Sequence, residues 1–583
     1  MITINPINKS KNNKRLNNFI LKKKFKNEKR YLNLLFFPFN IYLHYNKYLL
    51  LFLTIILYPK FILNRTNNKS RLLNKLNSII ISINGTGIQK ILSDNFNNLP
   101  NEICYNETNC SIISNNSIDN LTNEINEISL SWNIPLTNCD NMFDGLSNIT
   151  KIDFSYFDSS KVTSMRYMFR KCTLLTSIII GDLATDKLRD MEGMFYECIN
   201  LKSLDLYNFD TSSVITMRHV FHGCHSLITL NISNFNTLSV IDMEGMFSEC
   251  SSLQSLDLYN FDTSSVTTMK DIFFDCKSLT VLDISNFNTL SVIDMGGMFY
   301  GCNSLLSLDV TNFITSSVLR MDGMFRDCNQ LTNLDLSSFN TALVQNMKDM
   351  FGLCRKITSL NLSNFDTSSI EDMGGMFYCC NSIKFLDLNN FDTHSVINMN
   401  GMFNGCNSLE KLNINNFNSS LVTNYERMFQ DCEKLNILNL YNFNFYSVEK
   451  FENMFINCKN MVYCINENIN INITSQLKLL NRGKINSDTN ECLQNCTNDG
   501  DYKYEYNNKC YIECPNGTYL LPNNNNICKE ENIFINESNN YTYNNNTNYE
   551  ENENKEINSE FKNKIFLNET ELYNQIIQIS SNK

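Results

Sequence analysis

Phenylalanine recurs along this chain every 26 residues, with no insertion or deletion between residues 143 and 455. The series comprises Phe143, Phe169, Phe195, Phe221, Phe247, Phe273, Phe299, Phe325, Phe351, Phe377, Phe403, Phe429 and Phe455. Other apolar positions keep fixed offsets from it, so more than half of the chain is one unit copied in register. A strict period of about 20–50 residues is typical of a solenoid, in which each unit buries its apolar face against the next.

The unit that begins at Phe195 combines two hydrophobic periods. Residues 204–206 alternate apolar, polar and apolar, which predicts a short half-buried strand. Residues 214–224 have apolar side chains three or four positions apart, which is the spacing of one helix face. Ser212 and Ser213 precede this segment and are suited to cap its first amides. We therefore predict an α/β repeat, in which a parallel sheet and a row of short helices form a solenoid.

A Leu-x-x-Leu-x-Leu core and this length fit the leucine-rich repeat, which spans about 20–29 residues. Phe209 and its equivalents stand where the usual motif has Asn or Cys, so the unit is a variant. Copies such as MFSECSSLQSLDLYNFDTSSVTTM and MFYGCNSLLSLDVTNFITSSVLRM resemble the 26-residue repeat of bacterial surface proteins, known as the PARCEL or BspA-like leucine-rich repeat. The resemblance covers about residues 142–463. It implies a solenoid protein that is secreted or held at the cell surface and that acts in adhesion or binding. The resemblance implies no catalytic residue.

The remaining segments differ in composition. Residues 1–66 form a basic N-terminus with an apolar stretch at about 34–63, typical of a signal peptide or a signal anchor. Residues 67–141 lack the period, and we expect them to cap the solenoid, because a solenoid end exposes an apolar face. Residues 464–530 are rich in cysteine, and residues 531–583 are an Asn/Glu-rich tail too polar to form a core.

The 22 cysteines fall into two classes. Twelve recur once per repeat at a core position, which favours free, buried thiols. The others include eight disulfide candidates, since a leader that directs the chain across a membrane favours disulfides in a small extracellular module. The candidates are Cys104, Cys110, Cys464, Cys492, Cys496, Cys510, Cys514 and Cys528. Their pairing stays open, and a Cys₄ zinc site made by the two Cys-x-x-x-Cys pairs is the less favoured alternative.

Charge and motif content exclude several functions. The formal net charge is −11, which argues against nucleic acid as a partner. No phosphate-binding loop and no nucleophile–base set is present, so we predict no enzymatic activity and no cofactor. His219, His222, Cys224 and His225 cluster in one copy. We interpret them as one divergent repeat and not as a metal site.

One regular polar column marks a candidate binding surface. If the leucines of each strand point inward, the residue between them must point to the open face of the sheet. Carboxylates recur there, with tyrosines two residues on: Asp205, Tyr207, Asp257, Tyr259, Asp283, Asp309, Asp335 and Asp387. They are either a polar strip for a ligand or cation, or a solvated face that hydrogen-bonds to its neighbours, and the solvated face is the favoured interpretation.

The sequence thus predicts a non-enzymatic repeat protein, exposed at the cell surface or secreted. Its expected partners are a protein or glycan on another cell, matrix or wall, together with a membrane bound through the N-terminal apolar segment. Copies alternate in pairs, giving a 52-residue superperiod that favours binding by many weak contacts. Numerous Asn-x-Ser/Thr sites are consistent with secretion. The alternative is a structural spacer or coat protein whose Cys-rich module makes the contacts.

Overall fold

The computed structural model describes residues 77–105, 109–112, 115–466, 477–478, 480–498, 501–521 and 524–530. The apolar segment 34–63 and the tail 531–583 lie outside the described residues. Among the described residues, no helix has the length and apolarity that a bilayer span requires. The chain divides into one large unit, which contains the repeats and the cysteine-rich module up to Cys528, and a second unit of Gly517–Tyr519 with Lys529–Lys583.

The first part of the chain forms a mixed sheet that leads into the repeats. β1 (Ser78–Asn84) pairs antiparallel with β6 (Ile125–Ser131) and with β7 (Ile149–Tyr156). The sheet order is β4-β3-β6-β1-β7-β8, with β3 (Glu102–Tyr105), β4 (Asn109–Ser111) and β8 (Ser177–Ile179), while β2 (Gly87–Lys90) pairs with β5 (Ser117–Leu121). β7 pairs with β8 in parallel, so this sheet continues into the first turns of the solenoid.

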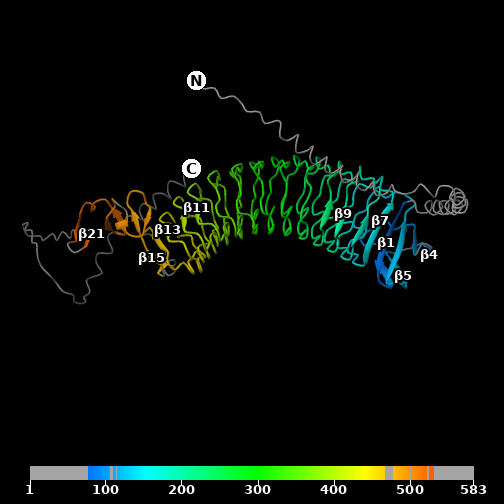
Figure 1. Cartoon of the computed structure of the whole chain (residues 1–583), viewed down its shortest axis with the longest axis horizontal. Helices are drawn as coiled ribbons and strands as arrows, with labels where there is room; N and C mark the ends of the chain where they lie inside the picture. Colours follow the sequence, from blue (N-terminus) through cyan, green and yellow to red (C-terminus); the bar gives the residue numbers. More distant parts are fainter. Residues whose placement is uncertain are drawn as a thin grey trace, which may run out of the picture. The chain divides into compact units, whose positions relative to one another are not determined.

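The repeats form a parallel β-solenoid, whose consecutive turns run side by side from cyan through green to yellow in Figure 1. A continuous ladder of twelve parallel bridges joins equivalent residues of neighbouring turns, from Asn138 to Lys450. We call the side of the solenoid that carries this ladder the bridge face. Its backbone bonds are short, as between Ile241 N and Ile215 O at 2.9 Å. The ladder therefore sets a register of one repeat per turn along the whole array.

The side predicted to carry the main sheet, here called the strand face, is only partly a sheet. Parallel strands occur towards the two ends of the array: β9 (Ser203–Asp205), β10 (Thr229–Asn231), β11 (Phe385–Asp387), β12 (Lys411–Asn413), β13 (Ile437–Leu440), β14 (Val462–Ile465) and β15 (Asn481–Arg482). Between residues 232 and 384, all described, no strand is defined. Single long bonds remain there, such as 3.4 Å from Leu306 N to Thr280 O.

The predicted helix in each repeat is wrong. No helix is defined within residues 142–463, all of which the structure describes. In the segment 214–224 the backbone turns left-handed at His219 (φ 54°) and at Gly223 (φ 71°), which interrupts any α-helix. Alternate amides donate to the next turn and not along a helix, as from Phe221 N to Met246 O at 2.9 Å. The apolar side chains spaced by three and four residues still point inward, but tight turns hold them there.

Stacked columns of identical side chains fill the core. The twelve successive pairs of the phenylalanine series stack with ring centroids 5.2–6.0 Å apart. The twelve cysteines of the repeats are free and buried, as predicted. Each donates its S–H to the carbonyl of a phenylalanine in the preceding turn, at 2.9–3.3 Å. Burial raises the pKa of Cys224 to about 12, so the thiol stays protonated.

Two polar columns add hydrogen bonds between turns. Buried Thr263 donates its hydroxyl to Asn288 O at 2.9 Å and accepts from Asn288 N at 2.8 Å. Most copies repeat the donation, and Thr211, Thr289, Thr315 and Ser419 repeat the complete pair. In eight copies the asparagine before the second phenylalanine donates to a carbonyl of the preceding turn, as from Asn286 to Tyr259 O at 2.6 Å. These amides are mostly exposed, although their role at the turn is structural.

A small disulfide-bonded module follows the last turn. It contains β16 (Lys484–Asn486), β17 (Cys492–Leu493), the 3₁₀ helix η1 (Cys496–Asn498), β18 (Tyr504–Tyr506), β19 (Lys509–Tyr511), β20 (Thr518–Leu521) and β21 (Asn524–Glu530). All eight candidate cysteines are paired, as Cys104–Cys110, Cys464–Cys492, Cys496–Cys510 and Cys514–Cys528. This pairing leaves no Cys₄ set for zinc in the module.

Candidate functional site: two faces of the solenoid and a groove at its end

The aspartates of the predicted column are exposed on the strand face. Each accepts a hydrogen bond from the backbone two residues on, as Asp309 does from Thr311 N at 3.0 Å and from the Thr311 hydroxyl at 2.6 Å. These donors hold the pKa of the Asp309 carboxyl below its usual range, and Ser285 does the same for Asp283. The carboxylates of Asp283 and Asp309 are therefore ionised and tied to their own turn.

The remaining members of the column behave alike. Asp205, Asp257, Asp335 and Asp387 accept from the backbone of Tyr207, Tyr259, Ser337 and Asn389 respectively, at 3.0–3.1 Å. Where the next copy has asparagine, its amide joins the column, at 2.8 Å from Asn231 to Asp205. These contacts give each carboxylate a structural role at the strand end and leave it accessible to solvent.

Large apolar side chains stand beside the aspartates on the same face. Exposed fractions reach 77% for Tyr259, 62% for Val281 and 59% for Leu306, on three consecutive turns. Phe385 and Tyr207 are exposed by 54% and 53%. A row of apolar side chains interleaved with carboxylates is chemically suited to a partner with both apolar and polar groups.

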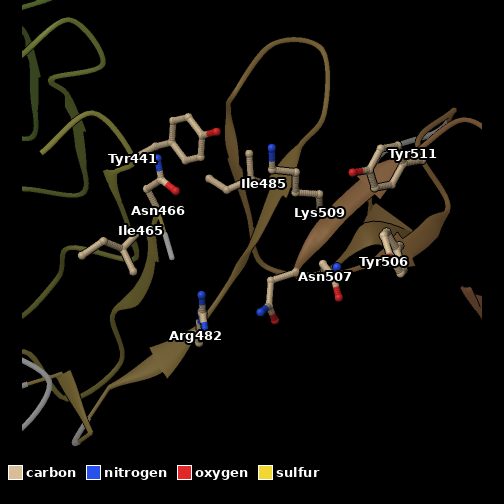
Figure 2. Close-up of a pocket in the computed structure, with 10 residues that line it drawn as sticks. Tyr441, Ile465, Asn466, Arg482, Ile485, Tyr506, Asn507, Lys509 and Tyr511 are labelled. Carbon is tan, nitrogen blue, oxygen red and sulfur yellow. The ribbon is translucent and has the colours of Figure 1, made fainter. Parts of the chain in front are cut away.

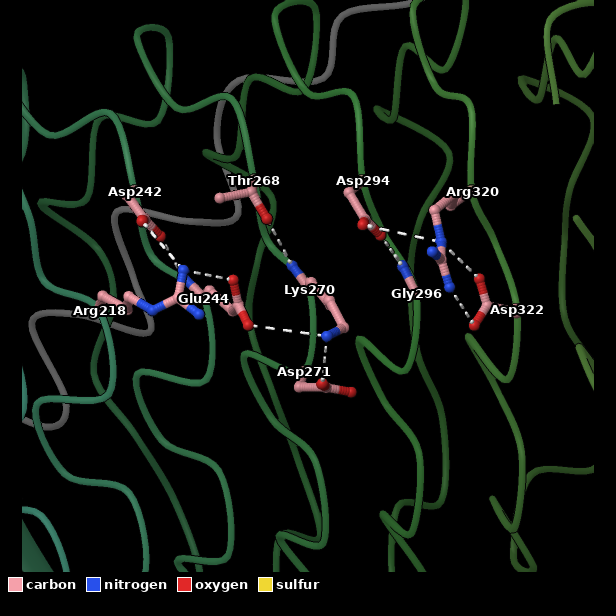
Figure 3. A network of polar contacts seen from close by, with 10 residues as sticks. All are labelled: Arg218, Asp242, Glu244, Thr268, Lys270, Asp271, Asp294, Gly296, Arg320 and Asp322. Carbon is pink, nitrogen blue, oxygen red and sulfur yellow. Dashed lines mark hydrogen bonds and ion pairs between the residues drawn. The ribbon is translucent and has the colours of Figure 1, made fainter. Parts of the chain in front are cut away.

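On the bridge face, residues of opposite charge in neighbouring turns form ion pairs (Figure 3). Arg218 lies 2.7 Å from Glu244 of the next turn and 3.6 Å from Asp242. Lys270, one turn further, lies 3.6 Å from Glu244 and from Asp271. Arg320 pairs with Asp322 at 3.0 Å. Half-exposed pairs of this kind contribute little stability, about 0–1 kcal/mol each, but their charges neutralise one another within the face.

The histidine cluster lies on this face as well. His222 stacks on Tyr196, with ring centroids 4.5 Å apart, and lies 3.8 Å from a Glu249 oxygen. His225 lies 3.7 Å from the other Glu249 oxygen. Cys224 points into the core and donates to Phe195 O. Among the described residues, the one group whose His, Cys, Asp or Glu ligand atoms converge is Glu102 with Cys104 and Cys110, and those cysteines form a disulfide.

A groove of about 350 Å³ lies where the last turns meet the cysteine-rich module, and Figure 2 shows the side chains that line it. We call it the junction groove. Tyr441 and Ile465 come from the solenoid end, and Lys509 and Tyr511 come from β19. The Lys509 ammonium lies 5.6 Å from the centroid of the Tyr441 ring, which is a cation–π distance.

The 26-residue pattern gave no signal for this groove. Arg482 and Lys509 lie beyond the repeats, where no period can align them. The opposite charges of Arg218, Glu244 and Lys270, by contrast, can be read from the sequence, because each of these residues follows a repeat methionine.

Among comparisons with known proteins, one family model matches the chain four times along the repeats. A family model described as "Mycoplasma protein of unknown function, DUF285" matches residues 137–255, 190–306, 304–384 and 378–489. No curated protein matches the chain. Among solved structures, one titled "Crystal structure of TLR13-ssRNA13 complex" matches at 16% identity and TM-score 0.21, over 56% of this chain and 48% of that one. The functional domain of InlJ from Listeria monocytogenes, with its cysteine ladder, matches at 14% identity and TM-score 0.14, over 56% and 68%.

Proposed function

Because the chain belongs to the DUF285 family over more than half of its length, and that family's description assigns no activity, we propose a function from the geometry of the repeats. The protein is a non-enzymatic repeat protein, secreted or held at the cell surface. It binds a protein or glycan on another cell, matrix or wall through the strand face of the solenoid. The aspartates and tyrosines of that face are its proposed contact residues.

The observation that carries the proposal is the exposure of apolar side chains along the strand face. Tyr259, Val281 and Leu306 each expose more than half of their surface on adjacent turns. Burying such a side chain against a partner is worth about 1.5–3 kcal/mol. The core columns already hold the turns together, so the exposed part of these side chains is available to a partner.

The aspartates give the same face a polar component. Ionised carboxylates such as Asp309 accept hydrogen bonds from sugar hydroxyls and pair with lysine or arginine of a protein. Each contact is weak on an exposed surface, about 1 kcal/mol or less. Repetition over successive turns multiplies weak contacts, so an array of copies provides avidity.

The disulfides support an extracellular location. Three disulfides in residues 464–528 are typical of small domains in an oxidising compartment. The apolar segment 34–63 supplies the expected route across a membrane. Fusing one tag to each terminus and determining the location of both tests this part. Finding both tags in the cytosol would contradict the proposal.

Binding itself is tested with the full chain on protein and glycan arrays and on whole cells. A triple variant, Tyr207→Ser, Tyr259→Ser and Phe385→Ser, should lower the apparent affinity at least about tenfold, because it removes three exposed apolar contacts. The matched control is Ile215→Ser, Ile241→Ser and Ile293→Ser, three exposed side chains beside the bridge ladder. If the first variant binds as well as the unaltered chain, the alternative of a spacer that makes its contacts through the cysteine-rich module takes precedence.

A further inference from the structure

The junction groove is built by elements that are distant in sequence and tied together by disulfides. Tyr441 directly follows β13, and Ile465 ends β14, one residue after Cys464. Arg482 ends β15. On the other side, Lys509 and Tyr511 flank Cys510 in β19. Since Cys464 pairs with Cys492 and Cys510 with Cys496, two disulfides fix the backbone on both sides of the groove.

A tight hairpin positions the far wall. β18 pairs antiparallel with β19, so Tyr506 lies opposite Lys509. Asn507 and Asn508 form the connecting turn, and both have positive φ, 45° and 61°, as a two-residue hairpin of the type I′ form requires. The parallel pairing of Ile485 with Lys509 joins this hairpin to β16. The groove is therefore formed before any ligand arrives.

The charge of the groove is opposite to that of the protein. The chain has a formal net charge of −11, yet none of the residues that line the groove is acidic. Arg482 and Lys509 line it, and among the described residues no carboxylate forms an ion pair with either side chain. The neighbouring Lys484, by contrast, is neutralised by Glu505 at 2.5 Å. Two cations thus remain available to an anion.

The other lining groups select the kind of anion. Tyr441 and Tyr511 offer ring faces and hydroxyls, and Asn507 offers an amide. Amides and phenols both donate and accept, which suits sugar hydroxyls that also do both, whereas a peptide carboxylate needs donors alone. Aromatic faces pack against the C–H faces of a sugar ring. A volume of about 350 Å³ lies at the low end of the range for small-ligand sites, of the order of 300–1,000 Å³.

We propose that the junction groove binds an acidic sugar residue of a polysaccharide, with Arg482 and Lys509 contacting its carboxylate. The rings of Tyr441 and Tyr511 pack against the sugar ring, and the Asn507 amide binds its hydroxyls. This adds a second contact site to the proposed function and does not depend on it, because the groove lies at the end of the array and not along the strand face.

The test uses the full oxidised chain and a hexuronate tetrasaccharide, with its neutral methyl ester as the matched ligand. Calorimetry should show binding of the acidic form, at least about tenfold weaker binding of the ester, and weakening as salt rises. The double variant Lys509→Gln and Arg482→Gln should lose at least about tenfold in affinity. The control variant Lys411→Gln and Lys503→Gln removes the same charge from exposed positions outside the groove and should bind normally.

Three results would overturn the proposal. They are equal binding of the ester, equal loss in the control variant, or preference for a poly-glutamate octapeptide over the tetrasaccharide. The strand-face variant of Tyr207, Tyr259 and Phe385 should bind the tetrasaccharide normally. If binding to the arrays is lost and binding of the tetrasaccharide is retained, the strand face has failed and the junction groove has not. The opposite result shows failure of the junction groove alone.

Discussion

The imidazole of His219 occupies the space that a side chain on Gly245, one turn further, would need. A Cβ atom on Gly245 would lie 2.3 Å from His219 Nδ1. Tyr167 lies over Gly193 in the same way, also at 2.3 Å. At these two positions a bulky side chain in one copy fills the space above a glycine in the next. Size complementarity between neighbouring copies therefore operates in this part of the array.

The pairing of His219 with Gly245 predicts an unusually damaging Gly→Ala change. Gly245 and Gly401 have the same left-handed φ, 58°, so alanine at either position should lose about 1–2 kcal/mol of stability. At Gly401 the nearest atom to a new Cβ is 3.7 Å away, so no clash is added. Gly245→Ala should lose a further 1–3 kcal/mol or so from overpacking, measured as a larger fall in melting temperature.

A double variant checks the cause. Adding His219→Gly to Gly245→Ala should raise the melting temperature again, until the remaining loss equals that of Gly401→Ala. If Gly245→Ala and Gly401→Ala have the same melting temperature, the proposed size complementarity does not govern Gly245.

Acidification should destabilise the turn that carries the histidines. Burial, above all, lowers the pKa of His219 and His222 below the ordinary value of 6.5, so both are neutral in the fold. The unfolded chain then binds more protons than the folded one below pH 6.5, and stability falls as pH drops through this value. Melting curves between pH 8 and pH 5 should show a decline that His219→Phe combined with His222→Phe reduces. A variant that declines as steeply as the unaltered chain would refute this assignment.

The sequence anticipated the core more accurately than the backbone. Periodicity placed Phe221 and Cys224 inside, and both are fully buried. The helix prediction failed because apolar residues spaced by three and four positions also occur in tight turns with two left-handed positions. Those positions are held not only by glycine but also by residues such as Glu197 (φ 54°) and Leu353 (φ 63°), so composition does not mark them. Bonds to the neighbouring turn impose them.

The sequence predicts one of the two candidate sites better than the other. Strand alternation placed Asp205 and its equivalents on the exposed face correctly. The junction groove depends on the pairing of Cys464 with Cys492 and of Cys496 with Cys510. Six cysteines allow fifteen pairings, so spacing alone does not bring Arg482 and Lys509 together.

The buried threonine column should be sensitive to loss of its hydroxyl. Thr263→Val keeps the shape but leaves Asn288 N and Asn288 O without their partner. A buried backbone group without a partner costs about 1–3 kcal/mol. Thermal melting should therefore show a clear loss for Thr263→Val and a much smaller one for Thr263→Ser, which keeps the hydroxyl. Equal losses in the two variants would point to the methyl group instead.

Thiol accessibility should separate one free cysteine from the rest. Fourteen cysteines are free, and all are buried except Cys379, which is partly exposed. A thiol reagent applied to the native protein should therefore modify Cys379 alone, detected by mass spectrometry of peptides. Denaturation without reductant should expose the others, while the four disulfides stay closed. Modification of Cys276 or its equivalents in the native state would contradict their burial.

Hydrogen bonds between equivalent residues, one set per turn, also determine how the solenoid should respond to mechanical load. Each turn is bonded only to its two neighbours, so force applied at one end meets one 26-residue unit at a time. Every detached turn releases about 85 Å of extended chain. Because the turns are so alike, the detachment forces should be similar. The array should therefore lengthen in equal steps while the turns behind the break keep their structure.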